Sequence, residues 1–255
     1  MQQPVLKLNR LSRGLAVALL WVSAMSAQAA ALTAGSPPSS APTTFLDTKT
    51  GKIEGFMPDV AHEVARRQKL DVDFTAVPFA TLIQSVIAGK IDMIVAGMTP
   101  TAQRAKRIAF SQDVTAFGAG LIVRDDNQKV YHSWKDLKGE VVGSMTGTDY
   151  SQHLIESGIA KEVKLYDSPA DMTRDIALGR VAAGMNDYPI IKAQEKAGGL
   201  KGMHVVEGYQ PESISPMAFG VKKGNDALLA KINAALTEMK ADGTLAALKT
   251  KWNMP

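Results

Sequence analysis

The sequence predicts an α/β protein of two lobes, each with a mostly parallel β-sheet flanked by helices. The main observation is that short apolar runs alternate with helix-like patterns in residues 32–107 and again in residues 141–185. Alternation at this spacing is typical of parallel strands joined by helical crossovers. The second observation is size, because 255 residues, 45% of them hydrophobic, suffice for one large or two small domains. Such values argue against a disordered chain and a polytopic membrane protein.

In the first half, each element is predicted from its own pattern of apolar residues. Pro58 suits the first turn of a helix, and Val60 and Val64 lie four residues apart on one helical face. Gly89 follows a later apolar face and is typical of a helix C-terminus. The expected elements are a strand near Leu32, a turn-rich stretch over 36–42, a helix over 56–70, a strand over 72–77, a helix over 82–87, a strand over 91–96 and a helix over 101–107.

The second half repeats this alternation and ends in two helices. Asp242 and Gly243 interrupt the amphipathic pattern near the C-terminus, which predicts a break between two helices. The expected elements are a strand over 141–145, a helix over 150–157, a strand over 163–166, a helix over 170–178, a strand over 181–185, a helix over 228–239 and a last short helix that reaches Trp252.

Residues 1–29 have the three parts of a cleavable signal peptide in the right order. A basic start precedes a short apolar run over 14–22, and Ala27-Gln28-Ala29 fits the small-residue cleavage rule. The apolar run is shorter than the roughly 20 residues that a spanning helix needs. The segment carries three of the 29 basic residues and none of the 25 acidic ones, so cleavage leaves a nearly neutral chain. We therefore expect an exported protein, and no nucleic-acid partner, since such partners require a basic surface.

The sequence contains no strong catalytic or metal-binding motif. It has no cysteine and only four histidines, which excludes a thiol nucleophile, a Cys-ligated metal and a disulfide scaffold. It also lacks the phosphate-binding, nucleophile-elbow and zinc-protease signatures. We predict no catalytic residue, no metal and no cofactor.

Two places suit a small ligand, although each also has an ordinary structural interpretation. Thr99, Thr101 and Arg104 follow a buried strand and open a predicted helix, where hydroxyls and a guanidinium can hold a carboxylate. Their alternative role is a helix cap with a surface arginine. Asp187 follows another strand, where ligands of α/β sheets bind, but an isolated Asp there is more often a turn or cap residue.

Five stretches of the chain, in order, resemble the bacterial extracellular solute-binding proteins of family 3, the periplasmic amino-acid receptors of ABC importers. The resemblance covers nearly all of the chain after residue 29, and the ordered set is more specific than any single motif. The stretches are GKIEGFMPD at 51–59, GKIDMI at 89–94, Thr99-x-Thr101-x-x-Arg104 with IAFS at 108–111, VGSMTGT at 142–148, and ADGT at 241–244 with Lys251-Trp252.

The resemblance implies the type II periplasmic binding protein fold, in which two α/β lobes are joined by two hinge strands. The hinge strands are expected near 117–124 and 216–222. Lobe 1 is then expected to span 30–118 and 219–255, and lobe 2 to span 119–218. The lobes of this family close around one ligand by a hinge motion.

The resemblance also implies a set of ligand-binding residues. Arg104 and Thr99 match the positions that hold the ligand α-carboxylate, and Gly97 matches a backbone position that faces the α-amino group. Phe79 matches an apolar contact to the ligand. Thr148 matches a residue that closes over the carboxylate, and Asp187 matches the acid that pairs with the α-ammonium. Both charges of a zwitterion need such partners when closure removes water.

Several positions depart from the family pattern. Ser40 and Pro37 stand at first-loop positions where many members carry an aromatic lid and an acid, so a cationic ligand side chain loses an obvious partner. Asp149 follows Thr148 where a small hydroxyl is common, and it is either a ligand contact or a first-turn residue that the helix dipole favours. Met57 and Ala182 replace acids at positions that we expect to lie outside the site. Together these departures mildly disfavour an acidic ligand.

The predicted function is a monomeric periplasmic receptor that captures an amino acid between two lobes and delivers it to an ABC permease. Two alternatives stay open. One is a cyclohexadienyl (prephenate or arogenate) dehydratase-like enzyme on the same scaffold, which needs a general acid over the leaving hydroxyl. The other is a receptor that serves signalling through a sensor kinase. The sequence does not identify the amino acid.

Overall fold

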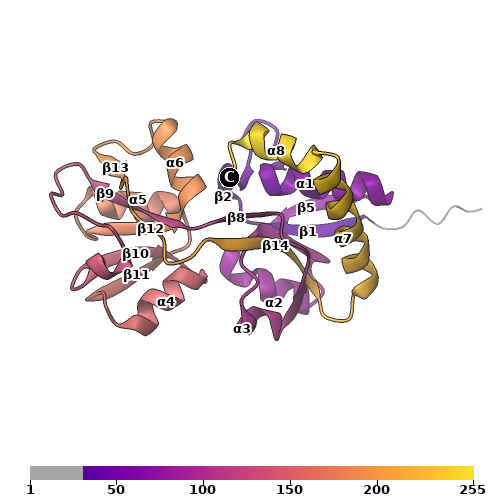
Figure 1. Ribbon diagram of the computed structural model, residues 1–255, viewed down its shortest axis with the longest axis horizontal. Coiled ribbons are helices and arrows are strands. Elements are labelled where there is room, and N and C mark those ends of the chain that lie inside the picture. Colours follow the sequence, from indigo (N-terminus) through magenta and orange to yellow (C-terminus); the bar gives the residue numbers. More distant parts are fainter. Residues whose placement is uncertain (1–30) are drawn as a thin grey trace, which may run out of the picture.

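The computed structural model describes residues 31–255, which form two lobes side by side (Figure 1). The predicted signal peptide, residues 1–29, lies outside the described residues. We call the six-stranded sheet and the helices that pack on it lobe 1, and the five-stranded sheet and the helices that pack on it lobe 2. The predicted α/β fold class is confirmed. Within residues 31–255, no helix has the length and apolar character needed to cross a bilayer.

The sheet of lobe 1 mixes parallel and antiparallel strands. β1 (Leu32–Ser36) runs parallel to both β5 (Val72–Ala76) and β6 (Met93–Met98), as the alternating pattern predicted. β14 (Ser215–Lys222) runs antiparallel to β6, to β7 (Ile108–Phe110) and to β8 (Thr115–Phe117). The sheet is therefore less parallel than expected, because its antiparallel member returns from the other lobe.

Helices cover both faces of this sheet, and β6 shows why its residues are apolar throughout. Met93 and Val95 pack toward one core, while Ile94, Ala96 and Met98 pack toward the other. The first core is covered by α1 (Phe56–Gln68), α7 (Asp226–Ala241) and α8 (Thr244–Trp252), and the second by α2 (Leu82–Ile87). The sequence of a strand that is buried on both faces is a continuous run of apolar residues.

Lobe 2 has the same layered construction. β10 (Val141–Met145) is parallel to β11 (Glu162–Tyr166) and β12 (Ala183–Asp187). β9 (Ala119–Arg124) is antiparallel to β12 and to β13 (Met203–Val205). α4 (Asp149–Ser157) covers one face, and α5 (Pro169–Ala177) with α6 (Tyr188–Lys196) covers the other.

The two crossing segments lie side by side between the lobes (Figure 1). β8 pairs with the start of β14 in the register Phe117 to Ser215 and Thr115 to Met217. From β8 the chain enters β9 of lobe 2 through the single residue Gly118. This pair of antiparallel strands is the covalent connection between the two sheets of the described chain.

Several predicted elements differ from the structure. The turn-rich stretch forms a small sheet of β2 (Ser39–Ser40), β3 (Thr44–Leu46) and β4 (Ile53–Glu54). The helix expected over 101–107 is a single turn, α3 (Ala102–Ala105), so it offers little helix dipole. The strands expected over 91–96 and 181–185 begin two residues later, because the apolar run includes the preceding turn. The helix α6 was not predicted.

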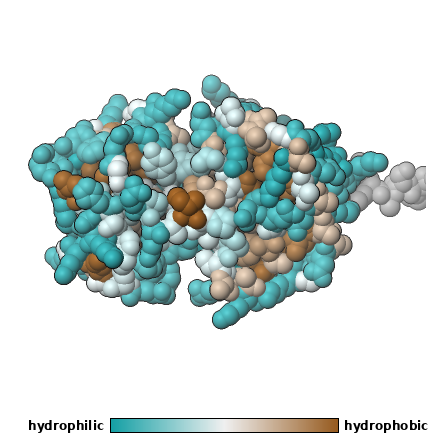
Figure 2. Space-filling view, in the orientation of Figure 1, coloured by the Kyte–Doolittle hydropathy of each residue, from teal (hydrophilic) through white to brown (hydrophobic). Residues whose placement is uncertain are grey.

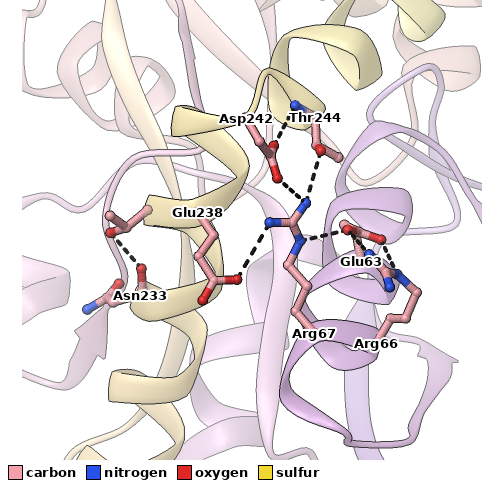
Figure 3. A network of polar contacts seen from close by, with 8 residues as sticks. Glu63, Arg66, Arg67, Asn233, Glu238, Asp242 and Thr244 are labelled. Atoms are coloured by element: carbon pink, nitrogen blue, oxygen red, sulfur yellow. Dashed lines mark hydrogen bonds and ion pairs between the residues drawn. The ribbon is translucent and has the colours of Figure 1, made fainter.

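Arg67 joins three helices of lobe 1 in one polar network (Figure 3). Its side chain, only 13% exposed, contacts Glu63 of α1 at 2.7 Å and Asp242 at 2.7 Å, and donates to Thr244 Oγ1 of α8 at 2.9 Å. The hydrogen bond from Arg66 and the contacts of Arg67 lower the pKa of Glu63 to about 2. The network fixes the break between α7 and α8 against α1, on the far side of the sheet from α2.

Candidate functional site

A cavity of about 270 Å³ lies between the lobes, close to the lower end of the range of about 300–1,000 Å³ for small-molecule sites. In the space-filling view, the molecular surface is notched where the two lobes meet (Figure 2). All eight residues that the sequence predicted for the site line this one cavity. They are Ser40, Phe79, Gly97, Thr99 and Arg104 from lobe 1, and Thr148, Asp149 and Asp187 from lobe 2.

Arg104 reaches from lobe 1 to lobe 2. It lies on the single turn α3, and the side chain of Thr101 caps that turn by accepting from Arg104 N at 3.2 Å. Its guanidinium donates to the carbonyl of Thr99 at 2.8 Å and to the carbonyl of Gly147 at 2.9 Å. It forms no ion pair with a carboxylate of residues 31–255, so its remaining donors can hold a ligand anion.

Gly147 of lobe 2 lies close to the backbone of lobe 1. Its φ of +78° is left-handed, and a Cβ there would lie 3.1 Å from Cα of Ala80 in lobe 1. A side chain at this position is therefore excluded both by backbone strain and by the opposite lobe. The turn brings the carbonyl of Gly147 to Arg104.

The other lobe 1 residues form a mainly apolar wall beside Arg104. The guanidinium lies over the Phe79 ring, 5.7 Å from its centre. Thr99 Oγ1 has only a 3.8 Å contact with the sulfur of Met217, so its hydroxyl is available to a ligand. A Cβ on Gly97 would lie 3.3 Å from Phe117, which keeps the backbone of β6 open at this point. Ser40 lies at the end of β2 and adds a small polar side chain.

Two predicted site residues begin helix α4. Thr148 is its N-cap, and its hydroxyl donates to the carbonyl of Met145 at 2.9 Å while accepting from Ser151 N at 3.3 Å. Because the Thr148 hydroxyl is engaged locally, its main role in the structure is to hold the start of α4. Asp149 is the next residue, and its carboxylate has no hydrogen-bond or ion-pair partner among the described residues.

Asp187 ends β12 and begins α6, so a strand end and a helix start both position it. Burial and the nearby charge of Asp149 raise its pKa to about 7, against the lowering effects of Tyr150 and Arg104. Burial lowers the pKa of Arg104, but Asp149 and Asp187 oppose that shift, and an arginine stays protonated. Asp187 is thus a carboxyl group that changes charge near neutral pH.

Tyr150 and Asn186 form a polar contact behind Asp187. The hydroxyl of Tyr150 donates to Asn186 Oδ1 at 3.1 Å, and the same oxygen accepts from Asp187 N at 2.8 Å. Asn186 is 2% exposed, and its Nδ2 has no hydrogen-bond partner among the described residues. Burial and the charge of Asp187 raise the pKa of Tyr150 well above its usual value, so it stays a hydroxyl donor.

The sequence analysis missed several residues at the outer end of the cavity. His153 lies one turn after Asp149 on α4, and its Nε2 is 3.0 Å from Glu212 Oε2. Trp134 packs edge-on against the His153 ring at 4.7 Å, and Tyr209 lines the same region. The spacing of four residues on α4 is a signal that could have placed His153 beside Asp149. Glu212 lies in the connection before β14, and no sequence pattern marks it.

The lining residues carry unlike charges in the two lobes. Arg104 is the only Lys or Arg among the described lining residues, and it belongs to lobe 1. The acidic lining residues, Asp149, Asp167, Asp187 and Glu212, all belong to lobe 2. Residues 31–255 contain no cluster of three or more metal-ligating side chains. The cavity therefore suits a small dipolar molecule whose anionic end faces lobe 1.

The chain belongs to family 3 of the bacterial extracellular solute-binding proteins, whose profile matches residues 32–255. It is 29% identical over 210 residues to the probable amino-acid-binding protein YxeM of Bacillus subtilis (strain 168), covering 82% of this chain and 79% of the relative. It is 29% identical over 204 residues to the L-cystine-binding protein TcyJ of Escherichia coli (strain K12), covering 79% and 75%. The family predicted from the sequence motifs is confirmed.

Solved structures agree with this assignment. An ancestral arginine-binding protein bound to arginine has a TM-score of 0.80 and 33% identity, over 88% of this chain and 99% of that chain. The ancestral amino acid-binding protein AncCDT-1, a precursor of cyclohexadienyl dehydratase, has a TM-score of 0.77 and 27% identity, over 87% and 95%. The predicted two-lobed binding-protein fold is confirmed, and the chain is a solute-binding protein.

Proposed function

We propose that the protein binds one amino acid in the cavity between its lobes and delivers it to the membrane permease of an ABC transporter. The observation that carries this proposal is the placement of Arg104 on lobe 1 and Asp187 on lobe 2, where each influences the pKa of the other. These groups match the α-carboxylate and the α-ammonium of a zwitterion. The amino-acid-binding and cystine-binding relatives support this ligand class.

The binding role of each lining residue belongs to this proposal. Arg104 holds the α-carboxylate, with the Thr99 hydroxyl beside it. Asp187 pairs with the α-ammonium, and Phe79 contacts the apolar part of the ligand. Thr148 contributes by fixing the start of α4 rather than through a free hydroxyl, because its own hydroxyl donates to Met145. No lining residue is assigned a catalytic role.

The proposal also covers where the protein acts in the cell and how its lobes move. The protein is exported by residues 1–29, acts as a monomer in the periplasm, and moves as two bodies, residues 30–118 with 219–255 and residues 119–218. Expression of the full chain in a Gram-negative host, followed by mass measurement, tests the export step. We expect the periplasmic protein to lack residues 1–29, and a full-length mass there would contradict the cleavage.

A thermal-shift panel on ligand-stripped protein tests the binding function. The panel contains the protein amino acids, ornithine, several 2-oxo acids and prephenate. A ligand at about 100 times its dissociation constant adds about 2.7 kcal/mol to the free energy of unfolding, which moves the transition of such a domain by several degrees. One clear response among the amino acids supports the proposal, and a flat response to all of them contradicts it.

Small-angle scattering tests the closure of the two bodies. A saturating amino acid should shrink the radius of gyration or narrow its spread, because the ligand joins Arg104 of lobe 1 to Asp187 of lobe 2. Identical profiles with and without a ligand that binds in the thermal panel would mean that the lobes do not move.

A dehydratase activity is the second candidate, and the pKa of about 7 for Asp187 is the observation that favours it. A general acid is most effective when its pKa lies near the working pH. The 27% identity to AncCDT-1, a precursor of cyclohexadienyl dehydratase, is the reason to test this activity. Incubation with prephenate tests the activity, since loss of water and carbon dioxide gives phenylpyruvate, which absorbs in the ultraviolet. No absorbance change with prephenate would remove this candidate.

A further inference from the structure

We propose that the ligand is an amino acid with a cationic side chain, and that Asp149, supported by Glu212, binds this second positive charge. The proposal rests on the proposed function, because it assumes that an amino acid occupies the cavity. It assigns the outer part of the cavity, on lobe 2, to the ligand side chain.

The first argument is a balance of charges inside the cavity. The α-carboxylate of an amino acid neutralises Arg104, and its α-ammonium neutralises Asp187. Asp149 then remains, without a hydrogen-bond or ion-pair partner in residues 31–255. Lobe closure removes water from this carboxylate, and a partly buried charge without a partner opposes binding. An ammonium or guanidinium on the ligand side chain supplies the missing partner.

The second argument is that acidic side chains outnumber basic ones around the cavity. Even when Asp187 is left out of the count, Asp149, Asp167 and Glu212 stand against Arg104 and His153. A neutral zwitterion leaves this excess in place, whereas a ligand of net charge +1 cancels it.

The third argument is the chemistry around Asp149 along helix α4. His153 lies four residues later on the same face, and Glu212 faces His153 at 3.0 Å. Trp134 and Tyr209 line the same region, and aromatic faces attract cations. Carboxylates combined with aromatic rings suit a cation on a flexible apolar chain. Lobe 1 lacks the acid that many family members carry at the positions of Pro37 and Ser40, and acids of lobe 2 take its place.

The fourth argument is a buried donor in the cavity wall that a ligand can engage. Asn186 is 2% exposed and lines the cavity next to Asp187, yet its Nδ2 has no partner among the described residues. A buried amide without an acceptor is costly. An oxygen of the ligand, such as the α-carboxylate, can accept from it. Asn186 and Asp149 together fit a ligand with an acceptor at one end and a donor cation at the other.

Pairs of amino acids with similar shape and unequal charge test the proposal without any mutation. L-arginine is compared with L-citrulline, and L-lysine with L-norleucine, by isothermal titration calorimetry on the full chain. We expect at least one cation to bind about tenfold or more tightly than its neutral counterpart, which corresponds to about 1.4 kcal/mol. Equal affinities in both pairs, or a preference for an acidic amino acid, would overturn the proposal while leaving the proposed function in place.

A matched pair of variants then locates the cation. Asp149→Asn should lower the affinity of the cationic ligand about tenfold and leave its neutral counterpart nearly unchanged. Glu156→Gln is the control, because Glu156 is exposed on the same helix and does not line the cavity. If Asp149→Asn lowers the affinity of both ligands equally, Asp149 has only a structural role at the start of α4. Absence of any amino-acid binding would instead contradict the proposed function, and this inference with it.

Discussion

The two walls of the cavity are built differently. The lobe 1 wall consists of a backbone strand end, the Phe79 ring, small hydroxyls and one positive charge, Arg104. The lobe 2 wall carries the acids, together with tyrosines, Trp134 and His153. In the proposed closure the two lobes bring these opposite charges together while water is removed, so each charge needs a partner. A zwitterionic ligand supplies both partners, and this links binding to lobe closure.

The two walls also differ in the orientation and protonation of their charged groups in the ligand-free protein. Arg104 is oriented by two carbonyl groups, one from each lobe, and keeps its charge. Asp187 has a pKa of about 7 and is partly protonated at neutral pH. The lobe 1 charge is therefore fixed, whereas the lobe 2 charge depends on pH and on the ligand. The predictions below test the two walls in turn.

The largest effect is expected from removal of the lobe 1 charge. Arg104→Ala should abolish measurable binding of every α-carboxylate ligand, a loss of about 2–5 kcal/mol, because a desolvated anion is left without its partner. Isothermal titration calorimetry gives the affinities. Arg107→Ala is the control, since Arg107 is exposed nearby, does not line the cavity and contacts Gln84. An unchanged affinity in Arg104→Ala would remove Arg104 from the site and with it the contrast between the walls.

Removal of the lobe 2 partner should have a smaller and more selective effect. Asp187→Asn should weaken amino acids about 30-fold, roughly 2 kcal/mol, because the ammonium loses its charged partner. The corresponding 2-oxo acids have no ammonium and should lose much less. A competition assay with both ligand classes measures the difference. If both classes weaken equally, Asp187 supports the cavity without contacting an ammonium.

The sequence predicted one wall better than the other. Arg104, Thr99 and Gly97 lie within one motif at the end of a buried strand, and the family resemblance assigned their roles. Asp187 was identified from a strand end together with the same resemblance. The outer part of lobe 2 was not, because Glu212, Tyr209 and Trp134 come from connections whose paths depend on tertiary packing. Local patterns predict regular elements, and they do not predict which loops meet across a cavity.

The same limit explains the errors in the fold. β14 was expected as a hinge strand, but its central antiparallel place between β6 and β7 depends on pairing over more than a hundred residues. The helix α6 begins directly at Tyr188-Pro189, after a strand with no intervening loop, so no separate start signal is visible. The helix expected at 101–107 is only one turn long because β7 follows at once.

The affinity for an amino acid should change about tenfold between pH 6 and pH 8, because Asp187 of lobe 2 titrates in this range. Asp187 must lose its proton to pair with an ammonium, and its pKa of about 7 in the empty cavity lies far above its usual value. Affinity should therefore fall as pH falls through 7, and the dissociation constant should be about tenfold larger at pH 6 than at pH 8. Asp149, Tyr150 and Arg104 face this carboxyl group.

The stability of the empty protein should change with pH in the opposite direction. Below pH 7 the native Asp187 holds a proton that the unfolded chain has released, so this group costs stability as pH rises from about 4 through 7. Denaturant titrations at several pH values measure this change. The variant Asp187→Asn should lose both the pH dependence of affinity between pH 6 and 8 and this part of the stability change. If the variant keeps the pH dependence of affinity, a group other than Asp187 is responsible.

The smallest effect is expected behind the lobe 2 wall. Tyr150→Phe removes the hydroxyl that donates to Asn186 Oδ1, the same oxygen that accepts from Asp187 N. Loss of one such hydrogen bond costs about 1 kcal/mol, so amino-acid affinity should fall about fivefold. The matched control is Tyr131→Phe, since Tyr131 is buried in lobe 2 away from the cavity and its hydroxyl accepts from Asn127 at 3.1 Å. The control should lower the melting temperature without changing affinity. If both variants reduced affinity equally, general loosening of lobe 2 would account for the loss, and Tyr150 would have no specific role in positioning Asp187.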